Sequence, residues 1–462
     1  MKIVFLFPDG VGIKNYLYSN LTHYLIEEGS ELILWHHLNA KLLNEVKRYH
    51  NFNLETRKPP GYRETVKEKF LRESASYARL LHNKKITRNE TILDNWNPAK
   101  KSIKHKIFYG LVECYGKSLK KYDQILNTER RHRNAVRNSK YFSDFLKFLE
   151  REKPDILFNT HQRAVAAIPA MEAAKMLGIT TVTAIYSWDN LPKARLATRA
   201  DYYLLWSEYM RRELKTYYPE IPEDRMEVTG TPQFDFYHDR SLWMEREEFC
   251  ELYGLDPEKK IICFSGDDKR TSPYDPDYLA DLAEAVMQMD PAERPQILFR
   301  RCPADFSDRY DAVLRQYVEL ITVADPLWNH DDDDWSLYYP SFDDVRLLVN
   351  IARHCDLVYN VGSTMAHDFA VFDKPACYIR YDQPHTVGWS VETIYRFQHF
   401  RSMEGLDAVV WIDGKEEILP KIRQALENPS EVARDRRKWL EIITGGETNV
   451  ARNIADFLTK KA

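Results

Sequence analysis

Short apolar runs alternate with longer amphipathic segments along most of this 462-residue chain. Four runs lie between Asp155 and Thr229, and six more lie between Ile261 and Ile412. Each run has the length of a buried strand, and the segments between runs are long enough to cross over a sheet as helices. The sequence therefore predicts an α/β protein built on parallel sheets.

The N-terminus adds a strand, a turn, a helix and a second strand before this alternation begins. Gly10 and Gly12 mark the turn, which is not a full GxGxxG because Asn15 replaces a glycine, so it predicts a Rossmann-like start and only weakly a dinucleotide site. The expected strands are residues 2–8, 31–37, 155–160, 181–186, 202–206, 226–229, 261–265, 296–300, 319–323, 357–361, 376–380 and 408–412. The expected helices between them are residues 13–28, 163–177, 208–217, 276–289, 307–317, 342–355, 364–372 and 416–427.

The chain is too long for one ordinary core, so two domains are expected. We predict a Rossmann-like domain over residues 1–240 with a helical insert over about 40–152, and a second Rossmann-like domain over 241–430. A helical segment, 431–462, ends the chain. Ligands of such sheets bind beyond the carboxyl ends of the strands, so two doubly wound domains facing a cleft are expected.

The composition is that of a globular protein, with 44% hydrophobic and 29% charged residues. No apolar run reaches the roughly 18 residues of a membrane span, and the strand after Met1 is too short and too soon interrupted for a signal peptide. We therefore expect a cytoplasmic protein. The six cysteines are scattered and form no CxxC pair, which favours reduced thiols over disulfides or zinc ligands.

Basic residues are concentrated in the expected insert. Between Arg57 and Lys147 there are 23 Lys and Arg against 9 Asp and Glu, a local charge of +14, and the rest of the chain carries −18. From Ile103 to Tyr115, apolar residues recur at three- and four-residue steps among lysines, as in an amphipathic helix. Two interpretations stay open: the apolar stripe packs on the first sheet, or it faces an anionic membrane surface.

The strongest local motif is LVYNVGSTMAHDFAVFDKP, residues 357–375. An apolar strand leads into Gly362, and Ser363 and Thr364 stand where a helix N-cap is expected. Such a turn directs backbone N–H groups and the positive end of a helix at one point, which favours a diphosphate. Asp368, one turn into the helix, is placed to accept hydrogen bonds from hydroxyl groups of the same ligand.

Polar residues follow the other expected strands of the second domain as well. They include Gly266 and two basic pairs, Lys269 with Arg270 and Arg300 with Arg301. Because the carboxyl ends of parallel strands meet at one edge, these residues and the turn after residue 361 predict a site for a nucleotide diphosphate.

The matching strand ends of the first domain also carry polar groups. They are Asp9 with Gly10 and Gly12, then His161, and then the run Ser187, Trp188, Asp189 and Asn190.

The tandem domains and the segment STMAHDFAVFDKP together resemble the GT-B superfamily of nucleotide-sugar glycosyltransferases. In that family a small-residue turn and helix bind the diphosphate, an acidic residue five positions after the serine binds the ribose, and [G/D]-K-P follows the helix. Ser363, Asp368 and Lys374 with Pro375 match this spacing, with Asp in place of the usual Glu. The segments YSWDNLPKARLATRADYYLLWSEYMRREL and VTGTPQFDFY are similar to bacterial surface-polysaccharide glycosyltransferases and to the related CDP-glycerol glycerophosphotransferases and UDP-N-acetylglucosamine 2-epimerases.

The resemblance implies a general base near the acceptor hydroxyl, often a His or Asp at the end of a first-domain strand. Asp9 stands in that place, with Asp189 and His161 as alternatives. Inversion is favoured, because the first of two glutamates found in many retaining members would fall on Asn360. Gly10, Gly12, Ser187, Trp188 and Asn190 are then expected on the acceptor side.

No metal or other cofactor is expected. A DxD motif is not evident, and the acidic run Asp331 to Asp334 is interpreted as a solvated loop before a metal site.

The leading hypothesis is a cytoplasmic glycosyltransferase of surface-carbohydrate assembly, of the capsule or O-antigen type. Its partners would be a nucleotide-diphosphate sugar, a carbohydrate or lipid-linked acceptor and, through the insert, the anionic inner face of the plasma membrane. Alternatives are a nucleotide-sugar 2-epimerase or a CDP-glycerol-type glycerophosphotransferase on the same fold, and a nucleotide-binding partner subunit without catalysis. No nucleic-acid-binding module is recognisable, so nucleic acid is not an expected partner.

Overall fold

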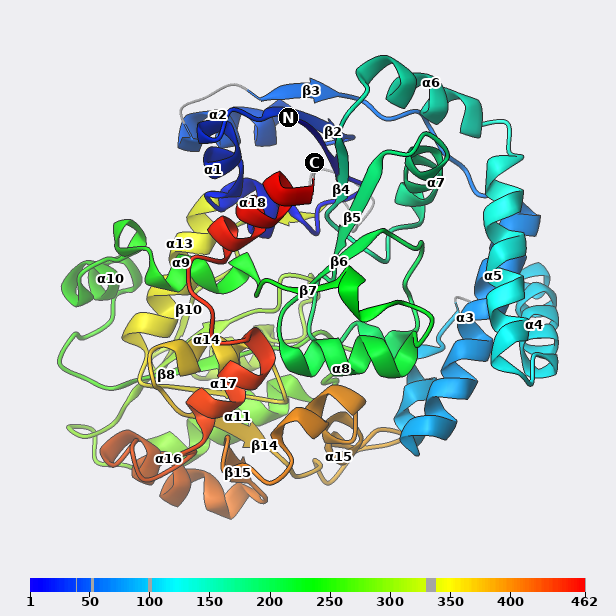
Figure 1. Cartoon of the computed structure of the whole chain (residues 1–462). Coiled ribbons are helices and arrows are strands. Elements are labelled where there is room, and N and C mark those ends of the chain that lie inside the picture. The colour runs from blue at the N-terminus through cyan, green and yellow to red at the C-terminus, as the bar shows by residue number, and fades with distance from the viewer. Residues whose placement is uncertain (39, 51–53, 99–101, 330–337, 462) are drawn as a thin grey trace. The chain divides into compact units, whose positions relative to one another are not determined.

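The computed structural model describes residues 1–38, 40–50, 54–98, 102–329 and 338–461, which divide into two compact units (Figure 1). Unit 1 comprises residues 1–232, 397–399 and 443–462, and unit 2 comprises residues 233–396 and 400–442. The boundary thus falls a few residues before the predicted one. The C-terminal segment, which the sequence analysis treated as a separate helical segment, is divided between the two units.

The described strands of unit 1 form a seven-stranded parallel sheet in the order β3-β2-β1-β4-β5-β6-β7. This is the order of a Rossmann-type sheet, in which the winding direction reverses between β1 and β4. The strands are β1 (Lys2–Phe7), β2 (Glu31–His36), β3 (Glu55–Arg57), β4 (Ile156–Asn159), β5 (Thr180–Ala184), β6 (Tyr202–Leu205) and β7 (Met226–Val228).

The helices of unit 1 are α1 (Leu21–Glu27), α2 (Ala40–His50), α3 (Val66–Thr87), α4 (Ile103–Ser118), α5 (Tyr122–Arg137), α6 (Phe142–Glu152), α7 (Ile168–Met176), α8 (Glu208–Tyr217) and α18 (Val450–Lys461). The first predicted helix begins instead as a π-helix, Lys14–Tyr18. The last helix, α18, packs on α1, where Arg452 forms an ion pair with Glu28 at 2.6 Å.

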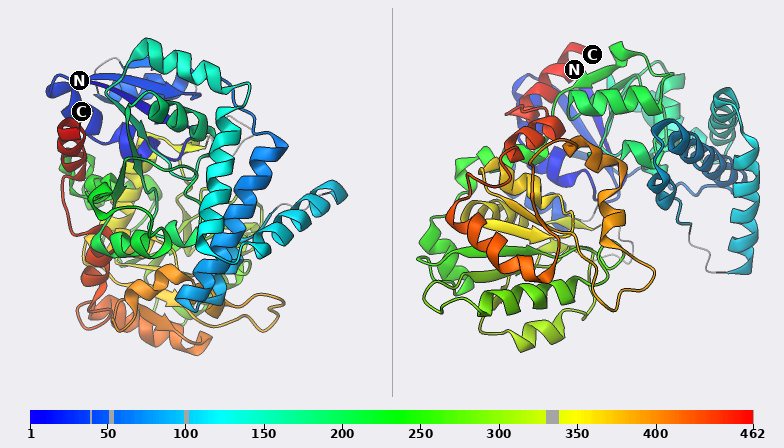
Figure 2. Two further views of the ribbon diagram at one scale, coloured as in Figure 1. Left: turned by 45° about the vertical axis from the view of Figure 1, so that its right-hand side comes forward. Right: turned by 90° about the horizontal axis from the view of Figure 1, so that it is seen from below.

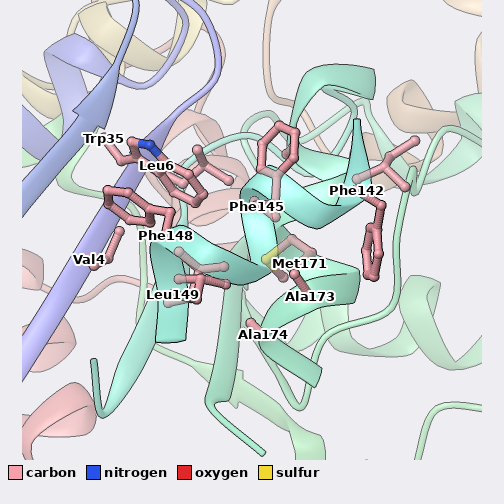
Figure 3. Packing of buried hydrophobic residues seen from close by; sticks show 14 of the residues in the cluster. Val4, Leu6, Trp35, Phe142, Phe145, Phe148, Leu149, Met171, Ala173 and Ala174 are labelled. Carbon is pink, nitrogen blue, oxygen red and sulfur yellow. The ribbon is translucent and has the colours of Figure 1, made fainter. Parts of the chain in front are cut away.

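The core on one face of this sheet explains the apolar periodicity of α6 (Figure 3). Its residues Phe145 and Phe148 pack against Trp35 of β2, with the rings of Trp35 and Phe148 stacked at 4.1 Å. Met171 of α7 joins the same cluster. The sequence placed α6 in the helical insert. In the structure α6 belongs to the core of the sheet, so the insert is shorter than predicted.

The insert itself is a group of three helices, α3, α4 and α5 (Figure 2). The capping box at the start of α3 has Thr65 Oγ1 accepting from the Glu68 N–H and Glu68 Oε2 accepting from the Thr65 N–H. The prediction of an entirely helical segment missed β3, a three-residue edge strand that is too short to show alternation.

The described strands of unit 2 form a six-stranded parallel sheet in the order β10-β9-β8-β13-β14-β15, again with a reversal, here between β8 and β13. The strands are β8 (Ile261–Ser265), β9 (Gln296–Arg300), β10 (Ile321–Val323), β13 (Leu357–Asn360), β14 (Ala376–Ile379) and β15 (Val410–Ile412). A separate antiparallel pair is formed by β11 (Trp328–Asn329) and β12 (Tyr339–Pro340).

The helices that begin in unit 2 are α9 (Asp235–His238), α10 (Arg246–Tyr253), α11 (Asp275–Met287), α12 (Asp311–Gln316), α13 (Phe342–His354), α14 (Met365–Val371), α15 (Val391–Tyr395), α16 (Ile418–Glu427) and α17 (Arg436–Thr444). None of the described helices in either unit is long and apolar enough to cross a membrane.

Candidate active site

The carboxyl ends of β1 and β4 bring Asp9 and His161 together, although 152 residues separate them. His161 Nδ1 lies 2.7 Å from Asp9 Oδ2, and the exposed fractions of the two residues are only 8% and 6%. Asp9 Oδ1 also accepts a hydrogen bond from the Val11 N–H at 3.1 Å. Because β1 and β4 flank the point where the sheet reverses, this pair lies where open α/β sheets bind their ligands.

The pairing fixes which nitrogen of His161 is available. A carboxylate only accepts, so the ring donates from Nδ1 to Asp9, and in the neutral imidazole the lone pair then lies on Nε2. The ring of Tyr186 contacts the imidazole edge-on, with 5.6 Å between ring centroids, and holds its plane. The sequence placed Asp9 first as the base, with His161 and Asp189 as alternatives, and the structure pairs Asp9 with His161.

Gly12 permits the close approach of the two strand ends. A Cβ atom at this position would lie 2.6 Å from the Thr160 side chain, closer than real Cβ contacts. Gly10 accepts the Ile13 N–H through its carbonyl and shapes the same turn. Both glycines therefore act on the shape of the site.

The carboxylate of Asp189, the remaining candidate base, already has ion-pair and hydrogen-bond partners within the protein. It forms an ion pair with Lys193 and accepts hydrogen bonds from Ser187 Oγ and Asn190 Nδ2, each at 2.8 Å. Although burial opposes ionisation, Lys193 and then His399 hold the pKa of Asp189 well below its ordinary value. A carboxylate with so low a pKa is a weak base, so Asp189 is better suited to fixing this loop than to catalysis.

The loop residues around Asp189 are held by its carboxylate and by packing. Asn190 also accepts from Gln162 Nε2 at 2.8 Å, which ties the loop to the end of β4. Trp188 is buried and packs edge-on against His399, with 4.6 Å between ring centroids. Ser187, Trp188 and Asn190 thus stabilise the loop, and the acceptor contacts predicted for them stay predictions.

In unit 2 the ends of β8 and β13 are adjacent, as predicted for the nucleotide side. Ser265 Oγ and Ser363 Oγ lie 3.5 Å apart, and Gly362 has a φ of +68°, which a glycine adopts without strain. The Ser363 N–H donates to Asn360 Oδ1 at 2.9 Å, and Thr364 is exposed at the start of α14. The turn is formed as expected, but one of its N–H groups is already satisfied within the protein.

The basic residues predicted to bind phosphate lie in different environments, from buried to exposed. Arg300 is buried and donates to both carboxylate oxygens of Asp344, at 2.9 and 3.0 Å, so its charge is neutralised within the core and its prediction as a phosphate ligand is not supported. Arg301 is half-buried and donates to the Ser307 carbonyl at 2.7 Å. Lys269 and Arg270 are exposed in the loop after β8, directly beyond Gly266.

Asp368 does not face the surface in this structure. Its exposed fraction is 3%, and burial followed by the charge of Asp368 raises the pKa of Tyr237 well above its ordinary value. Its carboxylate lies close enough to the buried Tyr237 to act on that pKa, and the ribose contact predicted for Asp368 stays a prediction. The periodicity that placed Asp368 on the first turn of α14 did not tell which face of that short helix is covered.

Sequence reasoning missed an acidic pair at the end of β8. The Asp267 N–H donates to Asp275 Oδ2 at 2.6 Å, and the Tyr310 hydroxyl donates to the same oxygen at 3.0 Å. Burial and the charge of Asp275 raise the pKa of Asp267 well above its ordinary value, and burial raises the pKa of Asp275 to about 6. Asp267 stands in the strand-end run that the sequence singled out, but Asp275 is eight residues away in a helix.

No cluster of three or more His, Cys, Asp or Glu that could hold a metal ion occurs in the part of the chain that the structure describes. The acidic run Asp331 to Asp334 lies outside that part.

Comparisons with known proteins establish the fold. No protein-family model and no curated protein sequence matches the chain. UDP-GlcNAc 2-epimerase from Neisseria meningitidis bound to UDP-GlcNAc has a TM-score of 0.53 and 11% identity, over 100% of this chain and 99% of that one. The S. aureus MnaA–UDP co-structure has a TM-score of 0.54 and 11% identity, over 99% and 96%.

A glycosyltransferase from Rickettsia africae ESF-5 has a TM-score of 0.52 and 10% identity, over 100% of this chain and 97% of that one. The chain is thus an α/β protein with two Rossmann-like domains of the GT-B type, as the sequence predicted. At these identities, the likeness to the epimerases and to the glycosyltransferase is a likeness of fold.

Proposed function

We propose that the chain is a glycosyltransferase that moves a sugar, with inversion, from a nucleotide diphosphate to an acceptor hydroxyl group in surface-carbohydrate assembly. The observation that carries the proposal is the buried Asp9–His161 pair at the reversal point of the unit 1 sheet. It supplies an oriented base in a GT-B-type fold.

In this proposal His161 Nε2 takes the proton of the acceptor hydroxyl while its oxygen attacks the anomeric carbon of the sugar. The bond between that carbon and the diphosphate oxygen breaks, and its electron pair leaves with the nucleotide diphosphate. Asp9 stabilises the imidazolium that forms, because its carboxylate accepts the hydrogen bond from Nδ1.

We assign the nucleotide diphosphate to the strand ends of unit 2. Lys269 and Arg270 are exposed there and can approach the phosphates, and the turn at Gly362 to Thr364 adds small residues and hydroxyl groups.

A nucleotide-sugar 2-epimerase is the second candidate, because solved structures with this fold include UDP-GlcNAc 2-epimerases by name. An epimerase needs groups that move protons at the sugar but no separate acceptor. The same strand-end groups could serve either reaction, so the products must decide.

The two reactions are separated by incubating the protein with UDP-, GDP- and CDP-sugars, with and without a mixture of candidate acceptors. Release of nucleotide that requires the acceptor supports transfer, and isomerised sugar without release supports epimerisation. If glycerol phosphate is transferred from CDP-glycerol, the chain is a glycerophosphotransferase. If nucleotides bind but none of these products forms, the chain is a binding subunit.

We also propose that α4 meets the anionic inner face of the plasma membrane and that the acceptor is lipid-linked. Ile103, Ile107 and Leu111 lie on one stripe of α4 with exposed fractions of 76%, 60% and 59%, while Tyr109 and Val112 are buried. Packing of the stripe on the first sheet is thus not observed. Exposed apolar side chains among lysines favour a membrane interface.

A further inference from the structure

A cavity of about 70 Å³ in unit 1 has five arginines among its lining residues. Helices α3 and α5 form one wall, and the chain after β4 and the loop before β6 form the other. The five arginines are Arg72, Arg133, Arg163, Arg195 and Arg199, and Glu129 is the one acidic residue among the lining residues of the described chain. A cavity of this charge is unusual unless something negative occupies it, because like charges repel.

Three of these arginines are neutralised by carboxylates. Arg72 donates to Glu64 at 2.7 Å, and Arg195 lies 3.7 Å from Glu73. Arg199 forms ion pairs with Glu129 and with Glu220, at 2.8 and 2.7 Å.

The other two arginines, Arg133 and Arg163, form no ion pair and no hydrogen bond with any residue in the described ranges. Burial lowers the pKa of both guanidinium groups. Beside them, His132 is 4% exposed, and its Nε2 has no hydrogen-bond partner in the same ranges, with the nearest Glu64 oxygen 3.9 Å away. The cavity therefore holds two surplus positive charges and an unsatisfied buried ring nitrogen.

The cavity wall includes the chain just after His161. Arg163 follows His161 by two residues, and its guanidinium senses the charges of Asp9 and Asp189. The Ala197 N–H donates to the Gln162 carbonyl at 2.9 Å and joins the arginine-bearing loop to the end of β4. A second cavity of about 520 Å³ shares Glu129, Arg133 and Arg199 with the first and has the size of an ordinary ligand pocket.

We propose that the arginine cavity binds a phosphate or diphosphate group of the acceptor substrate, with Arg133 and Arg163 as its ligands, and that the larger cavity receives the group attached beyond that phosphate. Guanidinium groups bind phosphate oxygens in pairs and remain charged when buried. Two surplus positive charges match the charge of a phosphate monoester. The assignment of this phosphate to the acceptor substrate rests on the proposed glycosyl transfer. The anion site itself rests on the cavity alone.

The cavity is assigned to the acceptor because all its lining residues belong to unit 1, next to the proposed base, whereas the donor nucleotide is assigned to unit 2. The accepting hydroxyl would lie at His161 and the phosphate at Arg163. A phosphorylated sugar, free or lipid-linked, has this arrangement of groups.

The test is calorimetric titration of the intact protein with inorganic phosphate, inorganic pyrophosphate and glucose 1-phosphate, and separately with UDP. The variants are Arg133→Gln and Arg163→Gln, and the control is Arg131→Gln, which removes an exposed arginine from the same helix outside both cavities. We expect each cavity variant to weaken binding of one or more phosphate probes by about tenfold or more, with UDP affinity unchanged. Arg131→Gln should change neither.

Two results would overturn the assignment. If no phosphate probe binds at low salt, the cavity holds only water. If all three variants weaken binding equally, the probes are attracted by the general positive charge of this region and not by the cavity. Preference for glucose 1-phosphate indicates a monophosphate, and preference for pyrophosphate indicates a diphosphate. If the probes bind through Arg133 and Arg163 but no acceptor-dependent nucleotide release is found, the glycosyl-transfer proposal fails and the anion site remains.

Discussion

The 2.7 Å contact between His161 Nδ1 and Asp9 assigns different tasks to the two residues. His161→Gln removes the nitrogen that would take the proton, so turnover should fall by about 10²–10⁴. Asp9→Asn keeps a similar shape but removes the charge that stabilises the imidazolium, so a comparable loss is expected. Donor binding should be nearly unchanged in both, because neither side chain belongs to the assigned nucleotide side.

The measurement is kcat and KM for acceptor-dependent nucleotide release, with donor affinity measured separately. His23→Gln is a matched control, since His23 is half-exposed and pairs with Glu27 on the surface helix α1. A folded His161→Gln variant with wild-type turnover would remove His161 from the mechanism.

The acidic pair Asp267 and Asp275 makes stability depend on pH in an uncommon direction. Both pKa values are raised in the folded protein, with that of Asp275 at about 6, so the folded state binds more protons than the unfolded state. The stabilising effect of these protons is complete below the unfolded pKa of about 4 and is lost as pH rises through the folded values.

Asp267→Asn removes one of these ionisable groups and the repulsion on Asp275. We expect the variant to be more stable than the wild type by about 1 kcal/mol near neutral pH and no more stable near pH 4, since a shift of one pKa unit corresponds to about 1.4 kcal/mol. Urea unfolding of the intact chain from about pH 4 to about pH 8 measures this. Asp308→Asn, at an exposed position nearby, is the control, and equal pH profiles for wild type and Asp267→Asn would contradict the prediction.

At the scale of elements, one buried arginine is prominent among the contacts that attach the helical insert to the body of unit 1. Arg79 of α3 is 1% exposed and donates to Glu129 of α5, to Glu220 after α8, and to the Tyr217 carbonyl. Its guanidinium also lies over the Tyr218 ring, 4.4 Å from the centroid.

Arg79→Met should therefore destabilise this attachment by about 3–5 kcal/mol, because Glu129 and Glu220 then share Arg199 as their ion-pair partner. Limited proteolysis should then cleave first within α3 to α5, and the thermal transition should shift downward. Arg212→Met, which removes an exposed arginine from α8, should change stability by no more than about 0.5 kcal/mol. An unchanged proteolytic pattern in Arg79→Met would show that the insert is held by other contacts.

For the whole molecule, the exposed stripe and lysines of α4 predict association with anionic membranes. Co-sedimentation with liposomes should rise with the fraction of anionic lipid and fall with salt, because the attraction is screened beyond a Debye length. Lys104→Glu with Lys106→Glu should weaken binding by roughly tenfold or more, at roughly 1 kcal/mol per basic residue. Ile103→Ser with Ile107→Ser should weaken it at every salt concentration.

Lys100 and Lys101, which belong to the same basic run, lie outside the described residues. Matched controls are Lys438→Glu and Val387→Ser, both at exposed positions of unit 2, and these should bind vesicles as the wild type does. If the wild type stays in the supernatant on anionic vesicles at low salt, the acceptor is soluble and the membrane proposal is withdrawn.

The sequence by itself determined the two parallel sheets, the turns at their carboxyl edges and the amphipathic character of α4. These features follow from local patterns: a buried parallel strand needs an apolar run, and its turn needs residues such as Gly362 that adopt a positive φ. The edges on which Asp9, His161 and Ser363 lie could be predicted for the same reason, since parallel strands end on one side of a sheet.

Only the tertiary structure decided which of these residues meet. Asp9 pairs with His161 because β1 lies beside β4, and Arg300 pairs with Asp344 because α13 brings that carboxylate to it. The periodicity of apolar residues predicted the apolar stripe of α4, but it did not predict which face of α4 packs on α3. The arginine cavity is lined by residues of α3, α5 and two loops that are far apart in the chain. Its net charge depends on which carboxylates lie close to each guanidinium group after packing.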